Sequence, residues 1–246
     1  MPIAMPVTQK PTSPPRRETK RPARSAGPAP AEKAGPAERR REPPTTGRAA
    51  VTYEKLMLAA GELLGEVGFE KLTTNGICAR ASMTPPALYH YFNDKYEILE
   101  ELARRLLKRQ SDAFAIWLFQ GGWQSAADRS QRLEEWYHIA AKIVAEEPGG
   151  VWTMRALRAL PSLAPVRLES QRTFTDQLFA FYRQIMPNVP PDILWYRLRI
   201  RAEFGYSVDE LAIEEDRIPR DILFREAARI VASAFADEEE ALSAKV

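Results

Sequence analysis

The chain has 246 residues, of which 45% are apolar and 28% charged, an ordinary balance for a globular protein. One cysteine (Cys78) and two histidines (His90 and His138) exclude an intrachain disulfide and disfavour a multi-histidine metal site, so we expect no metal and no cofactor. No apolar run approaches the roughly 18 residues of a membrane-spanning helix, and the Pro-rich, polar beginning is unlike a signal peptide. We therefore expect a cytoplasmic protein without a membrane partner.

Positive charge is concentrated at the start of the chain. Residues 1–50 carry 11 Lys and Arg against 4 Glu, although the whole chain has a net charge of only +2. Residues 1–48 also hold 11 of the 20 prolines and few large apolar residues, a composition that predicts a disordered extension. Arg39, Arg40, Arg41 and Arg48 form either an arm that contacts DNA phosphates or the minor groove, or a solvated basic linker.

Helical periodicity begins at Val51, and no strand pattern or internal repeat follows. Leu56, Ala60, Leu63 and Val67 lie at helical spacing, and Gly68 is placed to end that helix. Further helices are predicted over about 94–118, 133–144, 151–160, 174–185, 192–211 and 219–237, with breaks at Gly121-Gly122, Pro148-Gly149-Gly150, Pro161 and Pro187. The predicted fold is all-α, with a small N-terminal helical domain followed by a larger one.

Two short helices are predicted between the first helix and the one that starts near residue 94. Thr73 or Thr74 caps the first of them, and Thr84 caps the second, whose first turn tolerates Pro85 and Pro86. Two short helices joined by a tight turn form a helix-turn-helix, whose second helix fits the major groove of DNA. The side chains expected to face DNA are Asn75, Thr84, Pro85, Pro86, Tyr89, His90, Tyr91 and Lys95.

The same segment resembles the N-terminal domain of the TetR family of repressors. The resemblance covers about residues 53–102 and depends on Leu72-Thr73-Thr74, on the run from Pro86 to Phe92 (Pro-Ala-Leu-Tyr-His-Tyr-Phe), and on Lys95. It implies a three-helix DNA-binding domain over 49–95, with DNA contacts at Thr74, Asn75, Thr84, Pro85, Pro86, Tyr89, Tyr91 and Lys95. Two positions depart from the family pattern: Ser82 replaces the usual turn glycine, and Cys78 replaces an alanine.

For the rest of the chain the resemblance extends only to the number, order and length of the helices. It implies a ligand-binding and dimerisation domain over 96–240, whose last two long helices pair with their copies in a homodimer. Each candidate interface residue has the alternative of facing the chain's own core. The candidates are Leu194, Leu198, Gly205, Val208, Leu223, Ala227, Ile230 and Ala234.

Aromatic residues are frequent in this second domain. They are typical of a pocket for an apolar or aromatic effector, but at helical spacing aromatic residues more often belong to the core. The candidate effector contacts are Trp117, Trp136, His138, Phe174 and Phe181, and the effector itself stays unidentified.

Taken together, these features predict a sequence-specific DNA-binding transcriptional regulator. The resemblance further implies a ligand-responsive repressor that binds a palindromic operator as a homodimer. An enzyme is disfavoured because the sequence has no Gly-rich phosphate loop, nucleophile elbow or HExxH motif. Its adjacent carboxylates, such as Glu134 and Glu135, diverge on a helix. The alternative is a helical small-molecule-binding or partner-docking protein without operator binding, which the DNA-facing groups argue against.

Overall fold

The structure, a computed structural model, describes residues 43–121 and 126–233 and contains no strand within these ranges, as the all-α prediction requires. Its elements are α1 (Gly47–Lys71), α2 (Thr74–Ala81), α3 (Pro85–Tyr89), α4 (Lys95–Leu118), α5 (Ala126–Glu146), α6 (Gly150–Ala159), a 3₁₀ turn (Pro161–Leu163), α7 (Ala164–Ile185), α8 (Pro191–Glu214) and α9 (Arg220–Ser233). The basic run at Arg39–Arg41, Gly122 and residues 234–237 of the last predicted helix lie outside the described ranges.

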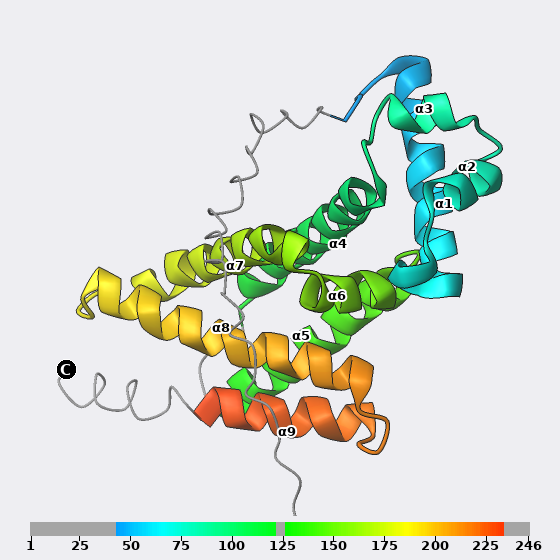
Figure 1. Cartoon of the computed structure of the whole chain (residues 1–246). Coiled ribbons are helices and arrows are strands. Elements are labelled where there is room, and N and C mark those ends of the chain that lie inside the picture. Colours follow the sequence, from blue (N-terminus) through cyan, green and yellow to red (C-terminus); the bar gives the residue numbers. More distant parts are fainter. Residues whose placement is uncertain (1–42, 122–125, 234–246) are drawn as a thin grey trace, which may run out of the picture. The chain divides into compact units, whose positions relative to one another are not determined.

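The first four helices share one core, and Figure 1 shows α1, α2 and α3 grouped beside the start of α4. Leu56, Ile77, Leu88 and Leu99, one from each helix, are all buried in this core. The apolar residues that the sequence places at helical spacing therefore face inward, and the hydrophobic effect holds the short helices α2 and α3 against α1.

Local capping signals fix where these helices begin. The Thr73 hydroxyl accepts a hydrogen bond from the Gly76 amide (3.1 Å), which caps α2. The Asp94 carboxylate caps α4 by accepting from the amides of Tyr96 (2.8 Å) and Glu97 (3.0 Å). Thr84 stands at the start of α3 without a side-chain cap, and the prolines at the first two helical positions have no N–H to satisfy.

The turn between α2 and α3 contains a strained residue. Ser82 has φ 55° and ψ 45°, and it is the one non-glycine residue with positive φ in the described ranges. This left-handed conformation favours glycine because a Cβ atom crowds the backbone. The departure noted in the sequence thus falls at a position whose left-handed backbone favours glycine.

We expect Ser82→Gly to raise the free energy of unfolding by about 1 kcal/mol, because it removes this steric cost. Urea denaturation of the two proteins at the same concentration measures the change. Ser82→Ala is the matched control: it keeps the Cβ atom, so it should give no gain. Equal stabilisation by glycine and alanine would show that backbone strain is not the cause.

Close backbone contacts join α1 to the turn that precedes α6. A Cβ atom on Gly61 would lie 2.6 Å from the carbonyl oxygen of Pro148, and one on Gly149 would lie 2.4 Å from the carbonyl oxygen of Gly61. Further along α1 the helical geometry ends at Gly68 (φ 75°), as predicted, and there the Trp152 ring of α6 fills the space that a Cβ atom would need. Glycines therefore allow α6 to contact α1 directly.

Arginines on α4 join this helix to three others. Arg105 donates two hydrogen bonds to Glu54 of α1 (2.7 and 2.8 Å), which lower the pKa of that carboxyl below its ordinary value. Arg109 pairs with Glu146 and Glu147 at the end of α5.

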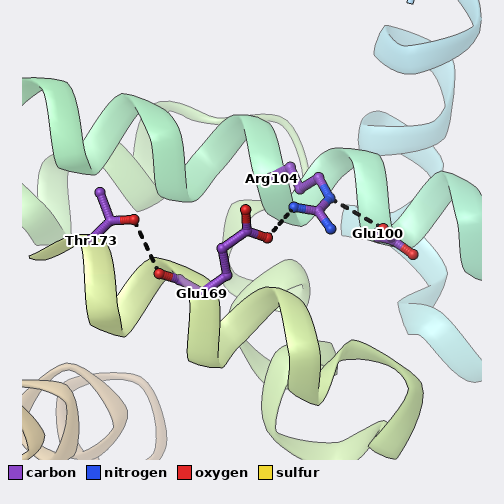
Figure 2. A network of polar contacts seen from close by, with 4 residues as sticks. All are labelled: Glu100, Arg104, Glu169 and Thr173. Carbon is purple, nitrogen blue, oxygen red and sulfur yellow. Dashed lines mark hydrogen bonds and ion pairs between the residues drawn. The ribbon is translucent and has the colours of Figure 1, made fainter. Parts of the chain in front are cut away.

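Arg104 makes the corresponding link to α7. Its Nη1 donates to Glu169 (2.6 Å), and its Nε donates to Glu100 of its own helix, as Figure 2 shows. Each of these exposed ion pairs is weak alone. Together they link α4 to α1, α5 and α7.

The remaining helices form further buried clusters. α5 packs against α9, α7 packs against α8, and α8 packs against α9. Phe114 and Trp117 of α4, Trp136 of α5 and Phe224 of α9 lie in the largest of these clusters. α7 begins at Ala164, about ten residues before the apolar positions from which the sequence predicts it.

Candidate functional site

Most of the residues predicted to contact DNA lie exposed on α2 and α3. Asn75 is exposed near the start of α2. Tyr89, at the end of α3, is 47% exposed, and its hydroxyl lies 3.1 Å from that of the half-buried Thr74. The other exposed members are Thr84, Pro85, Pro86 and His90. The two short helices thus present a common polar surface with two protruding prolines.

Tyr91 and Lys95 are less available than the sequence predicts. Both are half-buried. The Tyr91 hydroxyl donates to the Ala49 carbonyl (3.3 Å), and its ring lies edge-on to Tyr53. The Lys95 ammonium donates to the carbonyls of Phe69 and Glu70 (3.1 and 3.2 Å). In this conformation both polar groups hold α1 in place. The Lys95 ammonium does so by donating hydrogen bonds to carbonyls at the C-terminal end of α1.

The predicted dimer residues are distributed differently from expectation. Leu194 and Leu198 are buried against Tyr182 and Met186 of α7. Leu223 and Ala227 are buried in the cluster that α9 forms with α5, Val208 is half-buried against that cluster, and Gly205 lines an internal cavity. The chain itself covers Leu194, Leu198, Leu223 and Ala227, so these four side chains offer little surface to a second copy. Ile230 is 67% exposed, whereas Ala234 lies outside the described residues.

A different face of α8 exposes large apolar side chains. Tyr196, Ile200 and Phe204 are 56%, 63% and 60% exposed, and their four-residue spacing places them along one side of the helix. On α9, Ile222 and Ile230 are also exposed. Contiguous apolar surface of this kind marks an interaction site in a globular protein.

A cavity lies among α4, α5, α7, α8 and α9, and aromatic rings form a large part of its wall. Trp117, Trp136 and Phe174, three of the five predicted effector contacts, line it. His138 lies instead edge-on to Phe224, and Phe181 lies edge-on to Phe119. The sequence therefore identified part of the aromatic wall, and two of its candidates pack elsewhere.

The polar residues of this cavity were missed. Arg201, Tyr206 and Asp209 project into it from α8. Burial raises the pKa of Asp209 to about 7, and burial followed by the Asp209 charge raises the pKa of Tyr206. Tyr206 and Asp209 follow the buried Ala202 of the same helix by four and seven positions, and this spacing is the signal that assigns them to an inward face.

Within 43–121 and 126–233, no helix is long and apolar enough to cross a membrane. The same residues contain no group of three or more histidine, cysteine, aspartate or glutamate side chains arranged to hold a metal ion.

Comparison with known proteins separates the N-terminal helices from the rest. The family model for bacterial regulatory proteins of the tetR family matches residues 56–102. The tetracycline repressor protein class G of Vibrio anguillarum is 40% identical over 55 residues, which cover 22% of this chain and 26% of that protein. The class C repressor of Escherichia coli is 41% identical over 54 residues, or 22% and 25% of the two chains. The chain thus matches about a quarter of the length of these curated relatives.

Solved structures show the same fold over a longer stretch. A tetR-family transcriptional regulator from Streptomyces coelicolor superposes with a TM-score of 0.58 at 20% identity, over 79% of this chain and 87% of the other. The fatty acid degradation regulator FadR from Bacillus halodurans superposes with a TM-score of 0.56 at 14% identity, over 78% and 99%. At these identities the likeness concerns the fold alone.

Proposed function

We propose that the chain is a DNA-binding transcriptional regulator of the TetR type, because the family model for bacterial regulatory proteins of the tetR family matches residues 56–102. More closely, it acts in the cytoplasm as a ligand-responsive repressor that binds a palindromic operator as a homodimer. The observation that carries the proposal is the exposed surface of α2 and α3, where Asn75, Pro86 and Tyr89 protrude from a buried core.

This surface suits a duplex groove. An α-helix fits the major groove, where amide and hydroxyl groups bond to base edges and phosphates, and apolar atoms contact thymine methyl groups. Asn75 and Tyr89 supply the polar groups, and Pro85 and Pro86 supply apolar surface at the start of α3. The predicted domain limits of 49–95 and 96–240 remain part of the proposal, with α1 beginning two residues earlier, at Gly47.

The exposed stripe on α8 supports the proposed homodimer. One short recognition helix reads too few bases for operator-level specificity, whereas two related by a twofold axis read both halves of a palindrome. Tyr196, Ile200 and Phe204 on α8, with Ile230 on α9, offer the self-complementary apolar surface that such an interface needs. They replace the buried leucines as our interface residues.

Effector control acts through α4 in this proposal. The C-terminal half of this helix lines the aromatic cavity with Phe114 and Trp117, and its N-terminal half contacts α1 through Lys95 and Arg105. An effector that favours a different tilt of α4 changes the spacing of the two recognition helices and shifts the population away from DNA. A coupling free energy of about 1–3 kcal/mol weakens operator binding roughly 5- to 150-fold.

The test is operator binding by proteins altered on the α2–α3 surface. DNA fragments retained by the chain are selected from a random pool, and affinity for the selected sequence is measured by fluorescence anisotropy at fixed salt. Tyr89→Ala should weaken binding about tenfold, because it removes a contact worth roughly 1–3 kcal/mol. Ile116→Ala, which truncates an exposed apolar residue on α4, is the control and should change nothing. Failure to select any sequence, or undiminished binding by Tyr89→Ala, contradicts the proposal.

A further inference from the structure

The aromatic cavity contains an acidic side chain without a partner. Asp209 lines it from α8, and within the described part of the chain no hydrogen bond or ion pair reaches its carboxylate. A charge withdrawn from water is costly unless something compensates it. The same withdrawal from water raises the pKa of Asp209 to about 7.

The basic group of the cavity is already engaged. Nη1 of Arg201 donates to the Tyr182 hydroxyl (3.2 Å), and its guanidinium lies over the Tyr182 ring, 5.6 Å from the centroid. Arg201 precedes Asp209 by eight residues, which is about 12 Å along a helix axis. A second arginine, Arg220, borders a smaller cavity on the other side of Asp209 and donates to the Ala212 carbonyl. Neither arginine forms an ion pair with Asp209.

The walls around Asp209 favour a cation. Phe174 lies 5.8 Å from Tyr206 and 6.1 Å from Trp136, centroid to centroid, and all three line the cavity. The faces of aromatic rings carry partial negative charge and attract ammonium groups, most strongly where water is excluded. The cavity has a volume of about 70 Å³, room for on the order of five waters, and this size suits a ligand with one aromatic ring rather than several.

We propose that the effector is a single-ring aromatic amine, whose ammonium group pairs with Asp209 while its ring lies among Phe174, Trp136 and Tyr206. This inference deepens the proposed function and rests on it, because a bound amine is an effector only if the chain is a DNA-binding regulator. The Asp209 carboxylate accepts the charged hydrogen bond that no side chain of the cavity supplies, and the aromatic wall covers the apolar remainder of the ligand.

The experiment compares probes of equal shape and different charge on the DNA-free chain. Benzylamine, 2-phenylethylamine and 4-phenylbutylamine are each paired with the alcohol and the carboxylic acid of the same skeleton. Binding is followed by tryptophan fluorescence, since Trp117 and Trp136 line the cavity, and by calorimetry. At least one amine should bind ten times more tightly than its alcohol and its acid. Asp209→Asn and Asp209→Ser should reduce that preference to less than threefold.

Glu203→Gln is the matched control, because it removes an acidic group of α8 that pairs with Arg199 outside the cavity. It should leave the preference for amines unchanged. The proposal is overturned if no amine binds, if the acids bind more tightly than the amines, or if Asp209→Asn keeps the tenfold preference. Operator binding is measured separately, so a chain that prefers amines but retains no DNA would contradict the proposed function and leave the ligand class intact.

Discussion

Replacing both Ile200 and Phe204 with glutamate is expected to leave a folded monomer whose operator affinity is at least about a hundredfold lower. The two side chains are 63% and 60% exposed on one face of α8, so the chain's own core does not depend on them. In a twofold interface each substitution occurs twice, and four carboxylates then oppose one another where apolar surface was buried. Loss of one recognition helix removes half of the base contacts, which accounts for the fall in affinity.

Sedimentation velocity measures the oligomeric state, and anisotropy with the selected operator measures the affinity. The control replaces Ile116 and Phe119, which are also exposed but lie at the end of α4 and just beyond it, with glutamate in the same way. That protein should remain dimeric and retain its affinity. If the α8 protein sediments as the unaltered chain does, the exposed stripe is not the interface. If both proteins become monomers, the effect is a general one of added charge.

The N-terminal helices follow closely from the sequence because their signals are local. Thr73 and Asp94 cap helices, Pro85 and Pro86 begin one, and Gly68 ends another, and each residue acts within a few positions of itself. The start of α7 was missed because that prediction depended on apolar spacing and not on a local signal. Pro165 stands in its first turn, and the first apolar residues used for the prediction come about ten positions later.

The interface and the cavity depend on which neighbour covers each face, and a periodic pattern does not contain that information. α8 carries apolar residues on two sides: Leu194 and Leu198 face α7, whereas Ile200 and Phe204 face outward. The resemblance and the apolar spacing together suggested the first pair as part of the dimer surface. Asp209 stands next to Glu210, so it resembles part of a solvated acidic face until the packing of α4, α5 and α7 places it beside a cavity.

Asp209→Asn is expected to raise the free energy of unfolding at pH 8 by about 2 kcal/mol and to leave it almost unchanged at pH 4. Burial raises the pKa of Asp209 from 3.8 to about 7 in the folded chain. Between these values the folded state binds more protons than the unfolded state, so the stability that this group contributes is fully present below pH 4 and is lost as the pH rises through 7. A pKa difference of about three units corresponds to roughly 4 kcal/mol in the free energy of unfolding. Because the Asp209 carboxylate is partly accessible to solvent, we expect about half of that effect.

Thermal unfolding at pH 4, 6 and 8, at one protein concentration and without ligand, measures this dependence. At pH 8 the melting temperature of Asp209→Asn should exceed that of the unaltered chain by roughly 4–8 °C. The melting temperature of Glu203→Gln should show no gain over the unaltered chain that grows with pH, because the Glu203 carboxylate is paired with Arg199 outside the cavity. A difference between Asp209→Asn and the unaltered chain that stays constant from pH 4 to pH 8 would mean that the carboxylate is solvated. The cavity would then hold no uncompensated charge for an amine to neutralise.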